Sequence, residues 1–100
     1  MIEVLFFDGC PNHVPAVELA RSVVEEVGAD EPVREIEISD PSDADRQRFL
    51  GSPTIRVDGV DIEPGASERT DFGLSCRVYG DSGLPSREFL VAALSGRSER

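Results

Sequence analysis

Apolar residues occur in short runs along the chain, and the spacing within each run indicates its secondary structure. Residues 2–7 are mostly apolar, as in a buried central strand, and this run ends at Asp8-Gly9. In residues 33–38, Ile36 and Ile38 alternate with Glu35 and Glu37, and this period of two predicts a half-buried strand. Residues 54–57 predict a third strand that closes with the turn signal Asp58-Gly59, and residues 74–79 predict a fourth.

Helices are predicted from apolar spacing and from capping residues. Apolar residues recur every three or four positions from Val17 to Val27, and Gly28 is a suitable C-terminal stop. Asp40-Pro41 supplies an N-cap and a proline at the first helical position for a short charged helix over residues 42–50. Residues 85–95 carry the apolar face of a last helix, residues 60–73 show little periodicity, and residues 96–100 are expected to fray.

These elements predict an α/β fold in the order β-α-β-α-β-β-α. Right-handed crossovers would make the first three strands parallel, with the fourth strand antiparallel beside the third. The expected architecture is a four-stranded mixed sheet with helices on both faces. A chain of 100 residues is sufficient for one hydrophobic core, so we expect one domain over residues 1–95 and a flexible tail over 96–100.

Composition narrows the range of partners. The net charge is −10, which disfavours binding to nucleic acid or to an anionic membrane surface. The apolar stretch at the start ends after Phe7 and carries no basic residue, so neither a signal peptide nor a membrane span is expected. Two cysteines do not make a disulfide framework, and the expected location is the cytoplasm. The chain has no zinc-binding pattern and no Gly-rich phosphate loop, so no cofactor is expected.

The segment from Asp8 to His13 carries the most distinctive chemistry. It connects the first strand to the first helix and contains Cys10. The amides and the dipole of the following helix stabilise a thiolate, whereas the Asp8 carboxylate, about 7 Å away in water, opposes it by only ~0.6 kcal/mol. We therefore expect an exposed, partly ionised Cys10. His13 would assist as a base, or it would cap the helix or face solvent, and both interpretations are open.

The order of these features, with Ser52-Pro53 opening the third strand, resembles the thioredoxin/glutaredoxin superfamily. The resemblance covers the chain from about Ile2 to Leu94. It implies that Cys10 is the nucleophile and that Pro53 is a cis-proline opposite it. It also implies that Pro11, Ser52 and Pro53 form the substrate-binding surface, with the backbone of Ser52 pairing with an extended substrate.

The chain departs from this family at the second cysteine, because His13 occupies the fourth position of the motif. Cys76 is the other candidate for a resolving thiol. The alternation along residues 74–79 favours a core position for it, next to Leu74 and Val78 on one face. Arg77 would then lie on the other face. Together with Arg56 it would attract a carboxylate or thiolate ligand, or simply balance an acidic surface.

Three functions are consistent with these residues. The first is a thiol–disulfide oxidoreductase or redox sensor that exchanges with a protein or a low-molecular-weight thiol or disulfide. The second is a redox-inactive binding module with the same fold. The third is a soft-metal thiol protein of the mercury type, since thiolates select such metals and small bacterial proteins that look like this chain are associated with organomercurial lyases.

Overall fold

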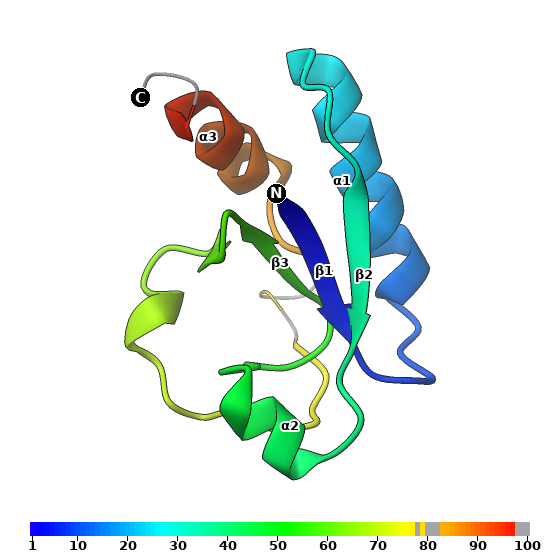
Figure 1. Cartoon of the computed structure of the whole chain (residues 1–100), viewed down its shortest axis with the longest axis vertical. Helices are drawn as coiled ribbons and strands as arrows, with labels where there is room; N and C mark the ends of the chain where they lie inside the picture. Colours follow the sequence, from blue (N-terminus) through cyan, green and yellow to red (C-terminus); the bar gives the residue numbers. More distant parts are fainter. Residues whose placement is uncertain (78, 80–82, 98–100) are drawn as a thin grey trace.

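The computed structural model describes residues 1–77, 79 and 83–97. Strands and helices alternate through the first half of the chain, and a hairpin and a C-terminal helix follow (Figure 1). The elements are β1 (Ile2–Phe6), α1 (His13–Val27), β2 (Val33–Glu37), α2 (Pro41–Arg46), β3 (Thr54–Val57), β4 (Val60–Asp61), the 3-10 turn η1 (Ala66–Glu68) and α3 (Arg87–Arg97).

The described strands form a four-stranded mixed sheet in the order β2-β1-β3-β4. β1 and β2 are parallel, as predicted, but β3 is antiparallel to β1, and the prediction of three parallel strands is wrong. The physical reason is the length of α2. A six-residue helix is about 9 Å long, whereas a five-residue strand is about 17 Å long, so α2 does not return the chain to the starting edge of the sheet. β3 therefore begins at the end where β1 and β2 finish.

The fourth strand also differs from the prediction. β4 follows directly after the Asp58-Gly59 turn and pairs antiparallel with β3. Its two residues are too few to give a visible alternation in the sequence. Residues 74–77 form no strand, and their part in the fold is an isolated parallel bridge between Cys76 and Ser52. Residue 78, which belongs to the predicted strand, lies outside the described residues.

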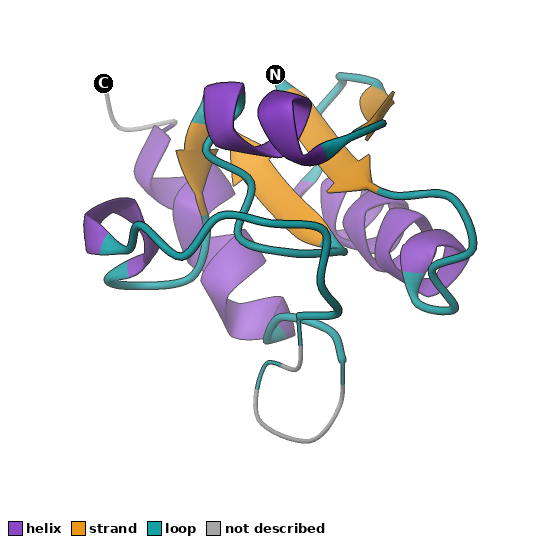
Figure 2. Cartoon of the chain, turned by 90° about the horizontal axis from the view of Figure 1, so that it is seen from below, coloured by secondary structure: helices purple, strands orange, loops and turns teal. Residues whose placement is uncertain are grey.

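Helices lie on both faces of the sheet (Figure 2), and an apolar cluster packs beneath them on each face. On one face, alternate residues of β1 and β3 pack against α1 and α3, with Ile55 and Leu90 fully buried. On the other face, Leu5 packs with Ala44 of α2 and with Phe49. Helices therefore cover both faces, as the binary pattern of the strands requires.

Capping residues set the ends of the helices. Gly28 adopts a left-handed conformation with φ 73°, and its N–H donates to Glu25 O and Val24 O, which ends α1 as predicted. The Asp40 carboxylate accepts from the N–H of Asp43 at 2.8 Å and starts α2. α2 ends at Arg46 rather than at residue 50, and α3 continues to Arg97 rather than ending at residue 95. Within the described ranges, no helix has both the length and the apolar character needed to cross a membrane.

Candidate functional site

The Ser52-Pro53 turn and the loop that contains Cys10 lie at the same end of the sheet. The Ser52-Pro53 peptide bond is cis, and Pro53 directly precedes β3. Leu5 near the end of β1 is the register partner of Thr54 at the start of β3. Because the two strands are antiparallel, the chain that leaves β1 toward Cys10 emerges beside the turn from which β3 begins.

The Cys10 thiol is less accessible than expected. Cys10 is 9% exposed, which corrects the expectation of an exposed residue, yet it belongs to neither apolar cluster. Its N–H donates to Phe7 O and its carbonyl accepts from the N–H of His13, both at 3.3 Å. α1 begins at His13 with Asn12 as N-cap, so Cys10 lies in the turn two residues before the cap rather than in the helix.

His13 is held by contacts with the sheet. Its Nε2 lies 2.6 Å from Glu35 Oε1, and its ring stacks on Phe6 with a centroid separation of 3.5 Å. These contacts attach the first turn of α1 to β1 and β2. Among the described contacts, none joins the His13 ring to Cys10, so its geometry supports anchoring of the helix more than proton transfer.

Cys76 is exposed, and the prediction that it packs in the core is wrong. The alternation that suggested a core position belongs to a segment that does not enter the sheet. The buried residue of this segment is its neighbour Arg77, which is 5% exposed. Both cysteines are free thiols.

Residues 73–77 run parallel to residues 49–52 and are joined to them by three backbone hydrogen bonds. The N–H of Gly73 donates to Phe49 O at 3.0 Å, and the N–H of Ser52 donates to Ser75 O at 2.8 Å. The N–H of Arg77 donates to Ser52 O at 2.9 Å. We call the backbone N–H and C=O of Ser52 the Ser52 edge. Both of its groups are occupied by the chain itself, so the docking role implied by the family resemblance has no free group in this conformation.

Gly51 allows this close approach. Its φ is +121°, and a Cβ at this position would lie 2.8 Å from Ser75 O and 3.3 Å from Arg77 Cβ. The 73–77 segment therefore packs directly on the backbone of residue 51. Glycine is required here both for the backbone conformation and for the space.

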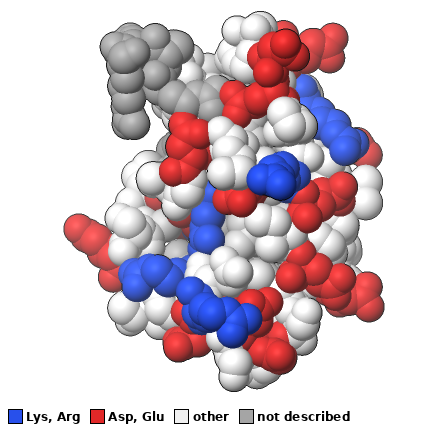
Figure 3. All heavy atoms as spheres, in the orientation of Figure 1, with Lys and Arg blue, Asp and Glu red and all other residues white. Residues whose placement is uncertain are grey.

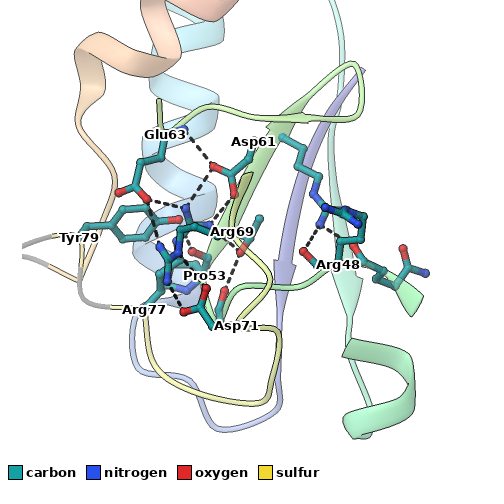
Figure 4. Close-up of polar contacts among 12 residues, drawn as sticks. Arg48, Pro53, Asp61, Glu63, Arg69, Asp71, Arg77 and Tyr79 are labelled. Atoms are coloured by element: carbon teal, nitrogen blue, oxygen red, sulfur yellow. Dashed lines mark hydrogen bonds and ion pairs between the residues drawn. The ribbon is translucent and has the colours of Figure 1, made fainter. Parts of the chain in front are cut away.

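A buried ionic cluster centred on Arg77 holds this segment in place (Figure 4). The guanidinium donates to Asp61 Oδ2 at 2.6 Å, to Glu63 Oε1 at 2.9 Å and to Thr54 Oγ1 at 3.0 Å. Burial opposes the charge, but the hydrogen bonds that Arg77 donates to Asp61 and Glu63 and the negative charge of Asp61 outweigh it, and the pKa of Arg77 is raised. The interpretation of Arg77 as a solvated surface charge is therefore wrong.

Tyr79 completes the connection to the proline turn. Its hydroxyl donates to Pro53 O at 2.6 Å, and its ring lies 4.5 Å from Arg77 Cζ. Burial raises the pKa of Tyr79 even though the Arg77 charge lowers it. Further along the chain, Gly83 lies against the N-cap Asn12, where an added Cβ would clash with Asn12 Nδ2. Tyr79 is thus attached to the proline turn, and Gly83 lies at the start of α1.

The exposed Cys76 lines a hollow of about 340 Å³ beside this cluster. The hollow is lined by charged side chains of both signs together with Leu50 and Tyr79. Arg69 and Asp71 form a two-point ion pair at 2.6 and 3.0 Å within it. The other lining residues are Glu63, Ser75 and Arg77. The face shown in Figure 3 likewise carries many acidic side chains with arginines among them.

The structure brings together part of the residue set predicted from sequence. Ser52, Pro53 and Cys76 lie at one turn, and Cys10 lies on the loop beside it, whereas His13 contacts Glu35 and Pro11 is exposed without a described contact to the site. Sequence reasoning missed the Arg77 cluster. The alternation along residues 74–79 does not distinguish a buried, ion-paired arginine from an arginine on the surface.

Arg56 is half-buried rather than solvated, and it donates to the carbonyl oxygens of Gln47 and Arg48 at 2.6 and 3.0 Å. Burial lowers its pKa. The described residues contain no group of three or more His, Cys, Asp or Glu side chains arranged to hold a metal ion. Comparison with family models, with curated proteins and with solved structures finds no match for this chain.

Proposed function

We propose that this chain is a thioredoxin-like thiol–disulfide oxidoreductase in which Cys10 and Cys76 form the redox pair. The observation that carries the proposal is the bridge between Ser52 and Cys76. It holds the second thiol at the turn that adjoins the Cys10 loop. Cys10 precedes α1 and Pro53 precedes β3, which is the order of features on which the family resemblance rests, and this order supports the proposal.

We assign the roles of the two thiols by their exposure, and this assignment reverses the one that the family resemblance implies, in which Cys10 is the nucleophile. Cys76 is exposed and Cys10 is nearly buried, so an external disulfide meets Cys76 first. The Cys76 thiolate attacks one sulfur of R–S–S–R′, forms a mixed disulfide with R–S and releases R′–S⁻. The Cys10 thiolate then attacks Cys76 Sγ, forms the Cys10–Cys76 disulfide and releases R–S⁻. The two protein thiols lose two electrons and two protons, and the external disulfide gains them as two thiols.

One feature supports Cys10 as the resolving thiol. It lies outside both apolar clusters, in the turn that leads into α1 beside the Ser52-Pro53 turn.

The redox-inactive alternative receives less support. A binding module that captured extended peptides at the Ser52 edge would need free backbone groups, but residues 75–77 occupy both of them. The soft-metal alternative would rest on the same two thiols, with no additional ligand cluster in the described part of the chain.

A thiol-titration experiment tests the proposal. The reduced chain is mixed with one equivalent of 5,5′-dithiobis(2-nitrobenzoate), and the products are weighed by mass spectrometry. We expect the wild type to release both halves of the reagent and to retain no adduct. Cys10→Ser should release one half and retain the other on Cys76. A wild-type product that keeps adducts on its cysteines would contradict an internal redox pair.

A further inference from the structure

We propose that the 73–77 segment closes the Ser52 edge against extended peptides, so that the redox pair reacts with low-molecular-weight disulfides bearing charged groups of both signs. This inference rests on the proposed function and names its class of substrate. It departs from what the family resemblance implies, because that resemblance makes the Ser52 edge the docking point for an extended chain.

The first step of the argument is the occupancy of the edge. A peptide that added itself as a strand would need to accept from the N–H of Ser52 and to donate to its carbonyl. Ser75 O and the N–H of Arg77 already make these two bonds at 2.8 and 2.9 Å. A bound peptide would therefore have to displace a segment of the same chain, whose effective concentration at the edge is high because it is covalently attached.

The second step is the strength with which the segment is held. Arg77 is 5% exposed and is bonded by its side chain to Asp61, Glu63 and Thr54 as well as by its backbone to Ser52. Displacing the segment would separate a buried cation from its carboxylates, which is strongly unfavourable. Tyr79 adds a further bond to Pro53 O at 2.6 Å. The edge is thus closed by Ser75 on one side of Cys76 and by Arg77 and Tyr79 on the other.

The third step is the space that remains open. Cys76 lines the hollow of about 340 Å³, near the lower end of the range of ligand pockets. A small disulfide fits a hollow of this size, whereas a peptide that docks as an added strand needs the closed edge. The acidic Glu63 and Asp71 and the basic Arg69 and Arg77 line it and pair with one another, so the hollow offers charge of both signs with no net charge, which suits a zwitterionic molecule better than one of a single sign.

A competition of substrate sizes tests the inference. The reduced wild-type chain is mixed either with L-cystine or with a 15-residue peptide cyclised by one disulfide. The second-order rate of forming the Cys10–Cys76 disulfide is measured by acid quench and mass spectrometry. Each rate is divided by the rate at which N-acetylcysteine reacts with the same disulfide, which removes the intrinsic reactivity of the reagent. We expect the normalised rate with L-cystine to exceed that with the peptide at least tenfold.

Variants that loosen the segment provide the second arm. Tyr79→Phe removes the bond to Pro53, and Arg77→Ala removes the ionic anchor. Among variants that retain the far-ultraviolet circular dichroism of the wild type, the preference for L-cystine should fall. A normalised peptide rate equal to that of L-cystine in the wild type would overturn the closed edge while leaving the redox pair intact. Failure of both disulfides to produce the internal disulfide would overturn the proposed function and this inference with it.

Discussion

The guanidinium of Arg77 lies 2.6 Å from the carboxylate of Asp61, with side-chain exposures of 4% and 9%. This ion pair joins the residue next to Cys76 to the last strand of the sheet. It fixes a loop residue, although neither partner belongs to an apolar cluster. The position of the exposed thiol therefore depends on buried charge rather than on apolar packing.

Replacing Arg77 with alanine should destabilise the chain strongly, because Asp61 and Glu63 would lose their buried counter-charge. The expected decrease in the free energy of unfolding is about 3–5 kcal/mol, measured by urea denaturation. The matched control is Arg46→Ala, whose exposed ion pair with Asp43 should change the same quantity by less than about 1 kcal/mol. Equal effects of the two substitutions would show that the Arg77 cluster does not hold the fold.

Gly51→Ala should destabilise the chain more than Gly28→Ala. Both glycines have positive φ, +121° and +73°, so each alanine carries a conformational cost of about 1–2 kcal/mol. At Gly28 the added Cβ meets nothing within 4 Å, but at Gly51 it would lie 2.8 Å from Ser75 O. Urea denaturation measures both changes. If the two variants were equally stable, the close packing of residues 51 and 75 would be refuted.

Tyr79 should make the chain sensitive to alkaline pH. Burial raises the pKa of Tyr79 above its ordinary value of about 10, so the folded state holds this proton more tightly than the unfolded state. The stability that this proton confers is complete below about pH 10 and is lost as the pH rises toward the folded-state pKa.

Urea midpoints of the wild type and Tyr79→Phe between pH 8 and pH 11 test this dependence. Tyr79→Phe lacks the hydroxyl at every pH. The informative quantity is therefore how the difference between the two urea midpoints changes with pH. The wild-type midpoint should fall more steeply above pH 10. Parallel curves would mean that Tyr79 ionises as freely in the folded chain as in the unfolded one.

Cys76 should react with a maleimide faster than Cys10 in the folded chain at pH 7. The reason is access, since Cys76 is exposed and Cys10 is 9% exposed. Labelling of Cys10→Ser and Cys76→Ser, each followed by mass spectrometry, gives the two rates, and we expect at least a tenfold ratio. In urea the two rates should converge. A faster Cys10 in the folded chain would reverse the roles assigned to the two thiols.

The first half of the fold could be predicted from local signals. β1, α1 and β2 follow from apolar spacing, and Gly28 and Asp40 act as the caps that the sequence indicates. The direction of β3 could not be predicted in this way, because it depends on how far α2 carries the chain. That distance is set by the end of α2 at Arg46, whereas the sequence pattern predicts a helix as far as residue 50.

The candidate site was predictable where it is local in sequence. The positions of Cys10 before a helix and of Pro53 before a strand follow from their neighbours along the chain. The surroundings of Cys76 do not, since they depend on the contact of Arg77 with Asp61, 16 residues away. Alternation assigned Cys76 to the core and Arg77 to the surface, and the ionic cluster reverses both assignments.

The most direct measurement is a non-reducing tryptic map of the chain after oxidation with one equivalent of L-cystine. Trypsin cleaves after arginine, so Cys10 falls in the peptide 1–21 and Cys76 in the peptide 70–77. We predict that these two peptides are recovered joined by a disulfide and separate on reduction. Recovery of the two peptides apart, each as a free thiol or as a mixed disulfide with cysteine, would contradict the redox pair.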